Sequence, residues 1–141
     1  ATYNELHPRL SPDGRWLAYV SNESGRNEVY MQPYPSLDRK IQLSDEGGYQ
    51  PIWSPDGKTI FYRSGVNMMA VDVSGTGNSI SASRPRTVFS ESIGYGKGFR
   101  HWGYDIAPDG RFLVTPVESE FFPREIDVTF GLFEELAKSG I

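Results

Sequence analysis

The sequence predicts an all-β domain built from three repeated units, and three observations lead to this fold class. A decapeptide with a Pro-Asp-Gly core occurs three times, at residues 10–19, 53–62 and 106–115. Its aspartates, Asp13, Asp56 and Asp109, stand 43 and 53 residues apart, close to the roughly 40–50 residues that a unit of four short strands needs. The segments that follow each copy are rich in aromatic and β-branched residues and too short for independent helices.

Each Pro-Asp-Gly sequence predicts a tight turn between two strands. Proline presets φ for the second turn position, aspartate tolerates the third, and glycine accepts the left-handed conformation that follows. We therefore expect a type I turn with a glycine bulge in each copy. The three aspartates are interpreted as turn residues, because a calcium loop needs alternating acidic residues and these are isolated.

The remaining elements follow in order along each unit. Second strands are predicted at residues 17–20, 60–63 and 112–115, third strands at 28–32 and 68–73, and fourth strands at 41–43 and 86–89. Clusters of Gly, Asn, Ser and Pro separate these runs. The third unit is shorter, with one further strand at 126–130 and a short C-terminal helix at 133–138. The units span about residues 6–46, 48–90 and 100–131 of a single domain, 1–141, with 1–5 as a spare closing strand.

Composition excludes several classes of function. A formal net charge of -4 provides no basic surplus for a nucleic acid backbone. No run approaches the ~20 apolar residues of a membrane helix, so membrane insertion is not expected. The chain starts at Ala1 without a signal pattern, which leaves open an export signal or further domains ahead of it. Cysteine is absent, which excludes disulfides and thiolate chemistry.

The repeats resemble a known family. Units with a Ser-Pro-Asp-Gly turn are similar to the WD-like repeats of TolB-like β-propellers. Over a wider range, residues 11–35, 51–73 and 104–114, with the Phe-Glu-Glu-Leu segment at 133–136, resemble the C-terminal sensor-like propeller of bacterial transmembrane serine/threonine kinases. That family usually carries Asn-Trp before Phe-Glu-Glu-Leu, where this chain has Gly131-Leu132. The resemblance implies four-stranded blades, a non-enzymatic scaffold for protein, peptide or small-ligand recognition, and a periplasmic or other extracytoplasmic location.

The number of repeats indicates half of a ring. Propellers of the resembling family close with about six blades, whereas this chain holds three. We expect a two-fold homodimer in which residues 2–4 of each copy complete the partner's third blade beside residues 126–130. Its interface should be apolar and exceed the ~1,600 Å² of a standard interface. The alternative is a fragment of a regulatory or sensor propeller from a kinase or peptidase whose catalytic domain is absent.

Aligning the three turns gives a candidate ligand-binding site. Residues 7–11, 50–54 and 103–107 occupy equivalent strands, which are the innermost strands of each blade in the resembling family. Nine residues around the starts of these strands should meet at the entrance of a central funnel: His7, Arg9, Tyr49, Gln50, Arg100, His101, Trp102, Tyr104 and Asp105. In the alternative interpretation, Tyr49, Trp102 and Tyr104 pack between blades while Arg9 and Asp105 form a solvated pair.

Catalytic chemistry is not expected. The sequence has no Gly-x-Ser-x-Gly elbow, and His7 and His101 are its two histidines, so a histidine-based triad has few ways to form. We expect no metal and no cofactor; a hydrolase in its own right is the remaining alternative. Five aromatic residues could form a stacking platform, but their equivalent repeat positions favour a core between blades. They are Trp16, Tyr19, Trp53, Phe61 and Tyr62.

Overall fold

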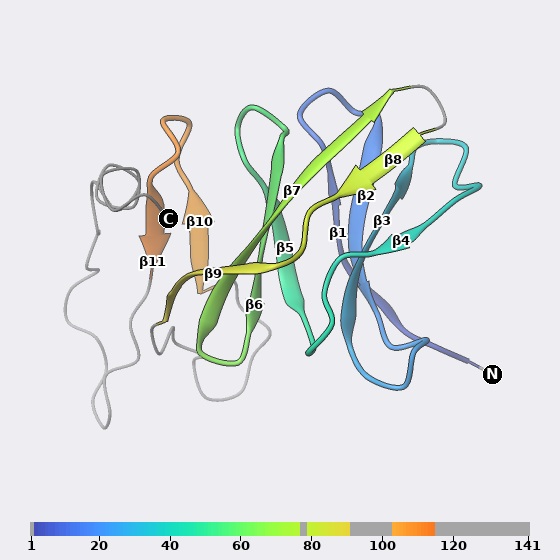
Figure 1. Cartoon of the computed structure of the whole chain (residues 1–141), viewed down its shortest axis with the longest axis horizontal. Helices are drawn as coiled ribbons and strands as arrows, with labels where there is room; N and C mark the ends of the chain where they lie inside the picture. The colour runs from blue at the N-terminus through green and yellow to red at the C-terminus, as the bar shows by residue number, and fades with distance from the viewer. Residues whose placement is uncertain (1, 77–78, 91–102, 115–141) are drawn as a thin grey trace.

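The computed structural model describes residues 2–76, 79–90 and 103–114, and every regular element in these ranges is a β-strand. The strands form two larger antiparallel sheets and one hairpin (Figure 1). The described residues contain no helix long and apolar enough to cross a membrane. The strand expected at 126–130 and the helix expected at 133–138 lie outside the described residues.

The first sheet, sheet I, contains four strands in the order β1-β2-β3-β4. They are β1 (Glu5–Leu10), β2 (Trp16–Ser21), β3 (Glu28–Pro33) and β4 (Ile41–Gln42). The strands predicted from the sequence in this unit are confirmed. β1 begins at Glu5, which pairs with Ser21, and the Asn4 amide donates to Asn22 Oδ1 at 2.8 Å. Part of the predicted closing strand thus extends the β1–β2 pair within its own chain.

The second sheet, sheet II, contains the predicted strands and one that was not predicted. Its strands are β5 (Tyr49–Trp53), β6 (Thr59–Ser64), β7 (Asn67–Thr76), β8 (Ser79–Ala82) and β9 (Arg86–Ser90). β8 and β9 follow one another along the same edge of β7. β7 runs three residues past its expected end, and with β8 it forms a hairpin arm, residues 73–76 and 79–82, where the sequence indicated a loop. Serine, glycine and alanine dominate this arm, so its strand signal is weak.

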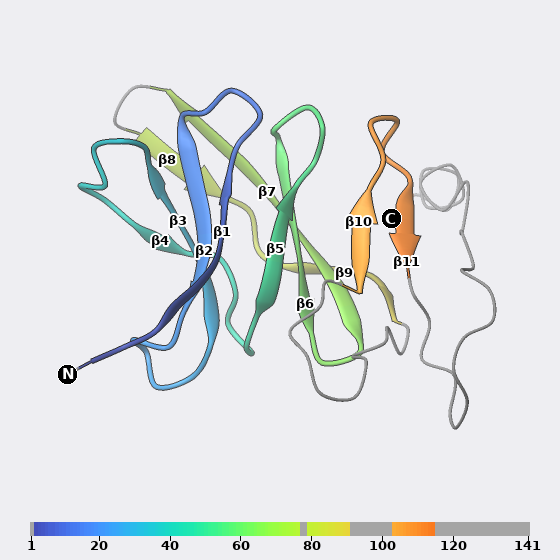
Figure 2. The ribbon, with the colours of Figure 1, turned by 180° about the vertical axis from the view of Figure 1, so that it is seen from behind.

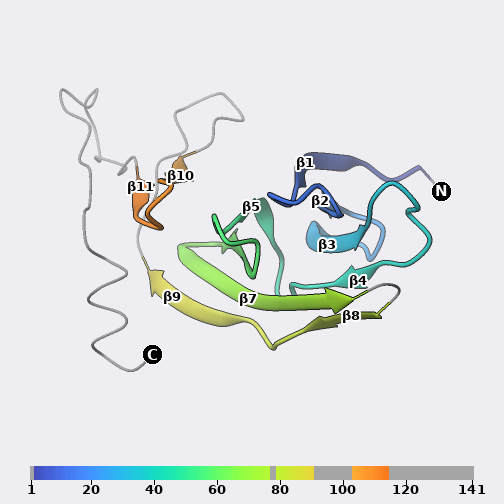
Figure 3. The ribbon, with the colours of Figure 1, turned by 90° about the horizontal axis from the view of Figure 1, so that it is seen from above.

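The third unit is described as the hairpin of β10 (Tyr104–Ile106) and β11 (Phe112–Val114). Seen from above, β1, β5 and β10 lie along one side of the molecule, and β4, β8 and β9 lie along the opposite side (Figure 3). The reverse view shows β1 and β5 in front of their sheets, with β10 beside β11 (Figure 2). The repeats therefore stand side by side in the same orientation.

The three Pro-Asp-Gly turns have the conformation that the sequence predicts. Gly14, Gly57 and Gly110 have positive φ values of 71°, 70° and 86°. Their amides donate to the carbonyls three residues earlier, at 2.8, 2.9 and 2.8 Å. All three turns lie at the same end of the molecule (Figure 1).

Two apolar clusters hold the units together. The larger joins sheets I and II and includes Trp16, Met31, Trp53 and Tyr62; the smaller joins sheet II to the β10–β11 hairpin through Phe61, Met68, Tyr104 and Phe112. The Phe61 and Phe112 rings meet edge to face with centroids 5.0 Å apart. Four of the five aromatic residues predicted to pack between blades belong to these clusters: Trp16, Trp53, Phe61 and Tyr62. Tyr19 is also buried, at 4% exposure, but it belongs to neither cluster and stacks on Tyr30 within sheet I. Burial of such large side chains dominates core energetics.

Candidate functional site

Matching irregularities occur in β1 and β5 at the positions aligned by the repeat. His7 and Gln50 have φ values of 54° and 52°, and each precedes a proline. Pairing shifts register between Leu6 and Arg9 and between Tyr49 and Ile52. Positive φ is uncommon outside glycine, and residues before proline favour extended backbone. The same bulge therefore recurs near the start of both first strands.

The structure brings some of the predicted site residues together. The Tyr104 hydroxyl donates to the Gln50 carbonyl, which ties β10 to β5. Trp53 Nε1 donates to the Arg9 carbonyl at 3.0 Å, which ties β5 to β1. These bonds connect the three first strands, because in each a side chain donates to the main chain of the preceding unit.

The predicted residues differ in accessibility. Gln50 and Tyr104 are buried, with 3% and 4% of their surface exposed, and His7 is half-buried. Arg9, Tyr49 and Asp105 are exposed. Arg100, His101 and Trp102 lie outside the described residues. Tyr104 belongs to the smaller apolar cluster, so it packs between units, as one of the two interpretations of the sequence expected.

The Pro-Asp-Gly turns form a second set of organised polar groups. The Ser11 hydroxyl donates to Asp13 Oδ1 at 2.6 Å and accepts the Trp16 amide at 3.0 Å. The Arg15 amide also donates to Asp13 Oδ1, and its Nε lies 2.7 Å from Oδ2. The Ser11 hydroxyl bond, followed by the Arg15 amide, lowers the pKa of Asp13 to about 2. The Asp13 carboxylate is therefore ionised, and its hydrogen bonds are made within its own turn.

The second turn repeats this arrangement and the third changes it. Ser54 donates to Asp56 Oδ1 at 2.6 Å, and this bond is the main cause of the lowered pKa of Asp56. In the third turn Ala107 replaces the serine. The pKa of Asp109 is still lowered, chiefly by the Arg111 amide, which donates at 3.1 Å.

A groove of about 680 Å³ lies between the first two turns, and sequence reasoning did not find it. Its floor includes Trp16 and Met31, and Arg15 and Lys58 from the two turns line it. Residues 72–75 of β7 form the remaining side. Gly75 of the arm lies so close to Trp16 that a Cβ there would stand 2.5 Å from Trp16 Cζ2. The groove depends on an arm that the sequence does not signal, which explains why it was missed.

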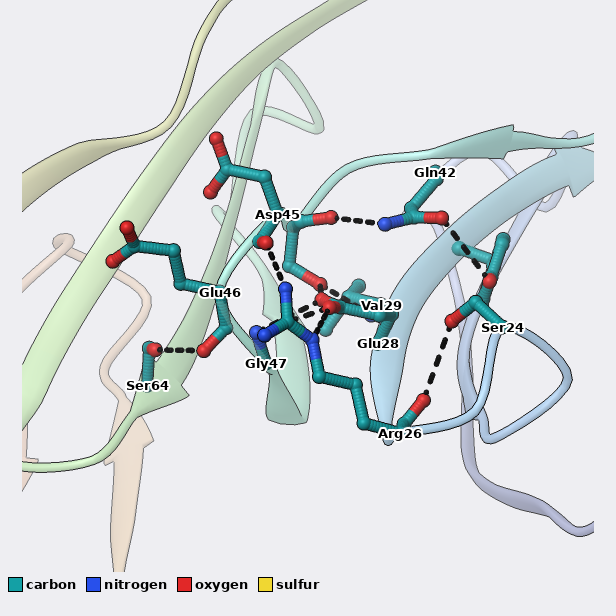
Figure 4. Close-up of polar contacts among 11 residues, drawn as sticks. Ser24, Arg26, Glu28, Val29, Gln42, Asp45, Glu46, Gly47 and Ser64 are labelled. Atoms are coloured by element: carbon teal, nitrogen blue, oxygen red, sulfur yellow. Dashed lines mark hydrogen bonds and ion pairs between the residues drawn. The ribbon is translucent and has the colours of Figure 1, made fainter.

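A third polar cluster, around the buried carboxylate of Glu28, is structural (Figure 4). Glu28 Oε1 lies 2.5 Å from Arg26 Nε, and Oε2 accepts the Ser44 hydroxyl. The Gly47 amide lies 3.1 Å from both carboxylate oxygens. These contacts hold the connection from sheet I to sheet II. Within the described ranges, acidic and histidine side chains form no cluster able to hold a metal ion.

Comparisons with known proteins match parts of the chain. No family model matches it. The chain is 41% identical over 58 residues to the Tol-Pal system protein TolB of Ruthia magnifica, covering 39% of this chain and 13% of that protein. It is 42% identical over 55 residues to TolB of Alcanivorax borkumensis, covering 38% and 13%. It is 40% identical over 55 residues to the uncharacterized peptidase YuxL of Bacillus subtilis, covering 38% and 8%.

A solved structure supplies the likeness in fold. The oligogalacturonate lyase of Vibrio parahaemolyticus matches with a TM-score of 0.51 at 16% identity, over 79% of this chain and 29% of that one. The described sheets have a propeller-like arrangement. The local similarity to TolB agrees with this fold at low coverage. The chain spans 8% to 13% of the length of the curated relatives it matches.

Proposed function

We propose that the chain is a non-enzymatic β-propeller scaffold that recognises a protein, peptide or small ligand at the starts of its first strands. The observation that carries this proposal is the pair of hydrogen bonds by which Trp53 and Tyr104 connect the first strands of neighbouring units. Their hydrogen bonds fix the backbone of neighbouring units, while Arg9, Tyr49 and Asp105 stay exposed beside it. A rigid backbone that presents a few polar and aromatic side chains suits recognition. Arg100, His101 and Trp102 complete the site in this proposal.

A scaffold fits the chain's chemistry better than an enzyme does. The sequence lacks a nucleophile elbow and cysteine, and its histidines cannot be assigned to a triad. Two of the similar proteins are named a peptidase and a lyase. We therefore expect no turnover of peptide, ester or oligogalacturonate substrates by the purified chain. Turnover that survives substitution of His7 and His101 by alanine would point to a contaminant, whereas turnover lost with either would contradict the scaffold.

The second part of the proposal is that two copies complete one six-bladed ring. Sheet I has an outer face, opposite the cluster shared with sheet II, that includes Leu17 and its register partner Leu10. Leu10 is 49% exposed. An outer sheet face of this kind is normally packed against a neighbour in a closed propeller. We further propose an extracytoplasmic location, in line with the resemblance of the repeats.

Membership of a longer regulatory or sensor propeller is the second candidate, because the chain spans a small share of its relatives. Sedimentation equilibrium of the purified chain at micromolar concentration separates the two. A discrete dimer supports self-completion. A folded monomer rejects it and favours the longer propeller.

A further inference from the structure

The groove between the first two turns offers an unpaired strand edge. On the edge of β7 that faces β6, register pairing ends with Asp72 and Thr59, and the Val73 amide adds one bond to the Lys58 carbonyl at 2.8 Å. β8 pairs with residues 73–76 on the other edge. Among the described residues, no strand pairs with residues 74–76 on the β6 side. An edge of this kind is a template for a further strand.

The alternation of the backbone identifies which groups are presented there. The Val73 amide points toward Lys58, whereas the Asp72 amide and carbonyl bond to Ser83 on the opposite edge. Because successive residues of a strand alternate in direction, the N–H and C=O of Gly75 lie on the β6 side. That side opens into the groove, which Ser74 and Gly75 both line.

The floor of the groove is apolar and the volume suits a short segment. Trp16 and Met31 contribute from sheet I, and Val73 contributes from the arm. The volume of about 680 Å³ falls within the range of clefts that hold ligands, roughly 300–1,000 Å³. A Cβ on Gly75 would point at Trp16, and residues directly opposite each other in a sheet share a face. The residue paired with Gly75 would therefore direct its side chain at Trp16, and its two neighbours would point to the other face.

The balance of charged residues around the groove favours a ligand that binds through an uncharged main chain. Three carboxylates line it, and each is already bonded within the fold. Asp13 pairs with Arg15, Asp72 with Arg86 at 2.8 and 3.1 Å, and Asp56 with the Ser54 hydroxyl. Arg15 and Lys58 line the groove, and Arg86 neutralises Asp72 from outside the lining. The three basic groups therefore balance the three carboxylates. A phosphate or nucleic acid ligand would require a basic surplus.

We propose that this groove binds an extended peptide, which adds as a strand to the open edge of β7 and places an apolar side chain against Trp16. This mode of recognition is strand addition, in which main-chain bonds provide affinity and side-chain pockets provide selectivity. It goes beyond the proposed function, because the groove lies at the turn end of the sheets and not at the starts of the first strands.

The test selects peptides and then locates where they bind. Phage-displayed random dodecapeptides are selected on the immobilised intact chain, and a selected peptide is titrated by calorimetry. Since the groove is charge-balanced, the Kd should change by less than about threefold between 50 and 500 mM salt. Two N-methylated versions of the peptide are compared, one methylated at its odd-numbered amides and the other at its even-numbered amides. One version should bind at least about tenfold more weakly than the unmodified peptide, and the other should lose much less affinity.

The absence of cysteine from the chain allows a clean blocking experiment. Lys58→Cys, alkylated with a bulky maleimide, should bind the peptide at least about tenfold more weakly than its unlabelled form. Val66→Cys is the matched control, because Val66 is 54% exposed at the other end of β6; its labelling should leave the Kd unchanged.

Four outcomes would overturn the proposal: no enriched peptide, equal binding by both N-methylated peptides, labelled Lys58→Cys that binds normally, or labelling that instead changes the mass of the chain in solution. The last outcome would identify the occupant as a second copy. None of these outcomes depends on the proposed recognition at the starts of the first strands. That proposal would fail separately, if substitution of Tyr49 left the Kd of a ligand bound there unchanged.

Discussion

Within each Pro-Asp-Gly turn, the residue two positions before the aspartate determines how the carboxylate is held. Ser11 and Ser54 donate to Asp13 and Asp56 at 2.6 Å. At the third turn Ala107 has no hydroxyl, and the Arg111 amide is the main partner of Asp109. The turns are thus stabilised by ionised carboxylates, which makes the stability of this end of the molecule sensitive to acid.

The first prediction concerns this pH dependence. The pKa of Asp13 falls from 3.8 to about 2 on folding, so the stability it contributes is fully present above pH 3.8 and is lost as the pH falls toward 2. Asp13→Asn should lower the melting temperature at pH 7, and this difference from the wild type should shrink between pH 4 and pH 2. Thermal melts followed by circular dichroism measure it.

Asp45→Asn provides the control for that measurement, because the described contact of Asp45 is made by its carbonyl. Its effect should be small at every pH. A difference between Asp13→Asn and the wild type that stays constant from pH 7 to pH 2 would contradict the role assigned to the carboxylate.

The second prediction concerns the glycine of the middle turn. Gly57 has a φ of 70°, and a Cβ there would lie 3.4 Å from Pro12 Cδ. A β-branched residue resists this conformation, so Gly57→Val should lower the free energy of unfolding by about 1–2 kcal/mol. Gly57→Asn should cost less, because asparagine tolerates positive φ. Urea unfolding of the three proteins checks the order; equal midpoints would remove the turn assignment.

At the scale of elements, the connection between sheets I and II depends on one buried carboxylate. Glu28 is 1% exposed and accepts from Ser44 and Gly47. The equivalent position of sheet II is Asn67, which pairs with Ser90 as Glu28 does with Ser44, and the Ser90 hydroxyl donates to Asn67 Oδ1 at 2.7 Å. In each sheet a serine therefore bonds to the first residue of the third strand: Ser44 lies two residues past the end of β4, and Ser90 is the last residue of β9.

The third prediction follows from Glu28. Glu28→Ala leaves the Ser44 hydroxyl and Gly47 amide without their acceptor, and an unmet buried polar group costs about 1–3 kcal/mol. Urea unfolding should show a loss of that size. Glu23→Ala is the control, since its ion pair with the exposed Lys40 should be worth at most about 1 kcal/mol. Equal losses of unfolding free energy in both variants would show that the buried contacts of Glu28 stabilise the fold no more than an exposed ion pair does.

The success of sequence reasoning differed between elements for physical reasons. β2, β3 and β6 carry aromatic and β-branched residues next to explicit turn residues, and the first part of β7 is apolar, so their positions were predictable. β8 pairs through its backbone with the arm of β7, and its small side chains carry little signal. The bulges at His7 and Gln50 arise from register shifts within paired strands, which one strand's sequence cannot display.

The candidate site was predictable in the same partial way. Alignment of the repeats found Gln50 and Tyr104, which the structure places in contact. It did not reveal that Tyr104 bonds to main chain, because the direction of a side chain depends on tertiary packing. The groove was not predictable, since it requires Gly75 of the arm to pack on Trp16 of another unit.

At the scale of the whole molecule, the outer face of sheet I poses the question of what covers it. Tyr19 and Tyr30 stack there with centroids 5.9 Å apart, and their hydroxyls contact Gln32 and Gln42. Lys40 lies 5.7 Å above the Tyr30 ring. This part of the face is closed by the sheet's own polar groups, so a partner's contact would centre on the exposed end near Leu10.

The last prediction tests that contact. If two copies complete one ring, Leu10→Lys should place a charge in the interface and shift the dimer toward monomer, raising the dissociation constant at least about tenfold. Val66→Lys is the matched control, because Val66 is exposed to a similar extent, 54% against 49%, and lies in the turn between β6 and β7. Removal of residues 1–3, which leaves the Asn4–Asn22 contact intact, should weaken the dimer as well if this segment closes the partner's third blade. Sedimentation velocity across a concentration series measures all three variants. A dimer equally tolerant of Leu10→Lys and Val66→Lys would rule out the outer face of sheet I as the interface, and a dimer unaffected by the truncation would rule out strand exchange.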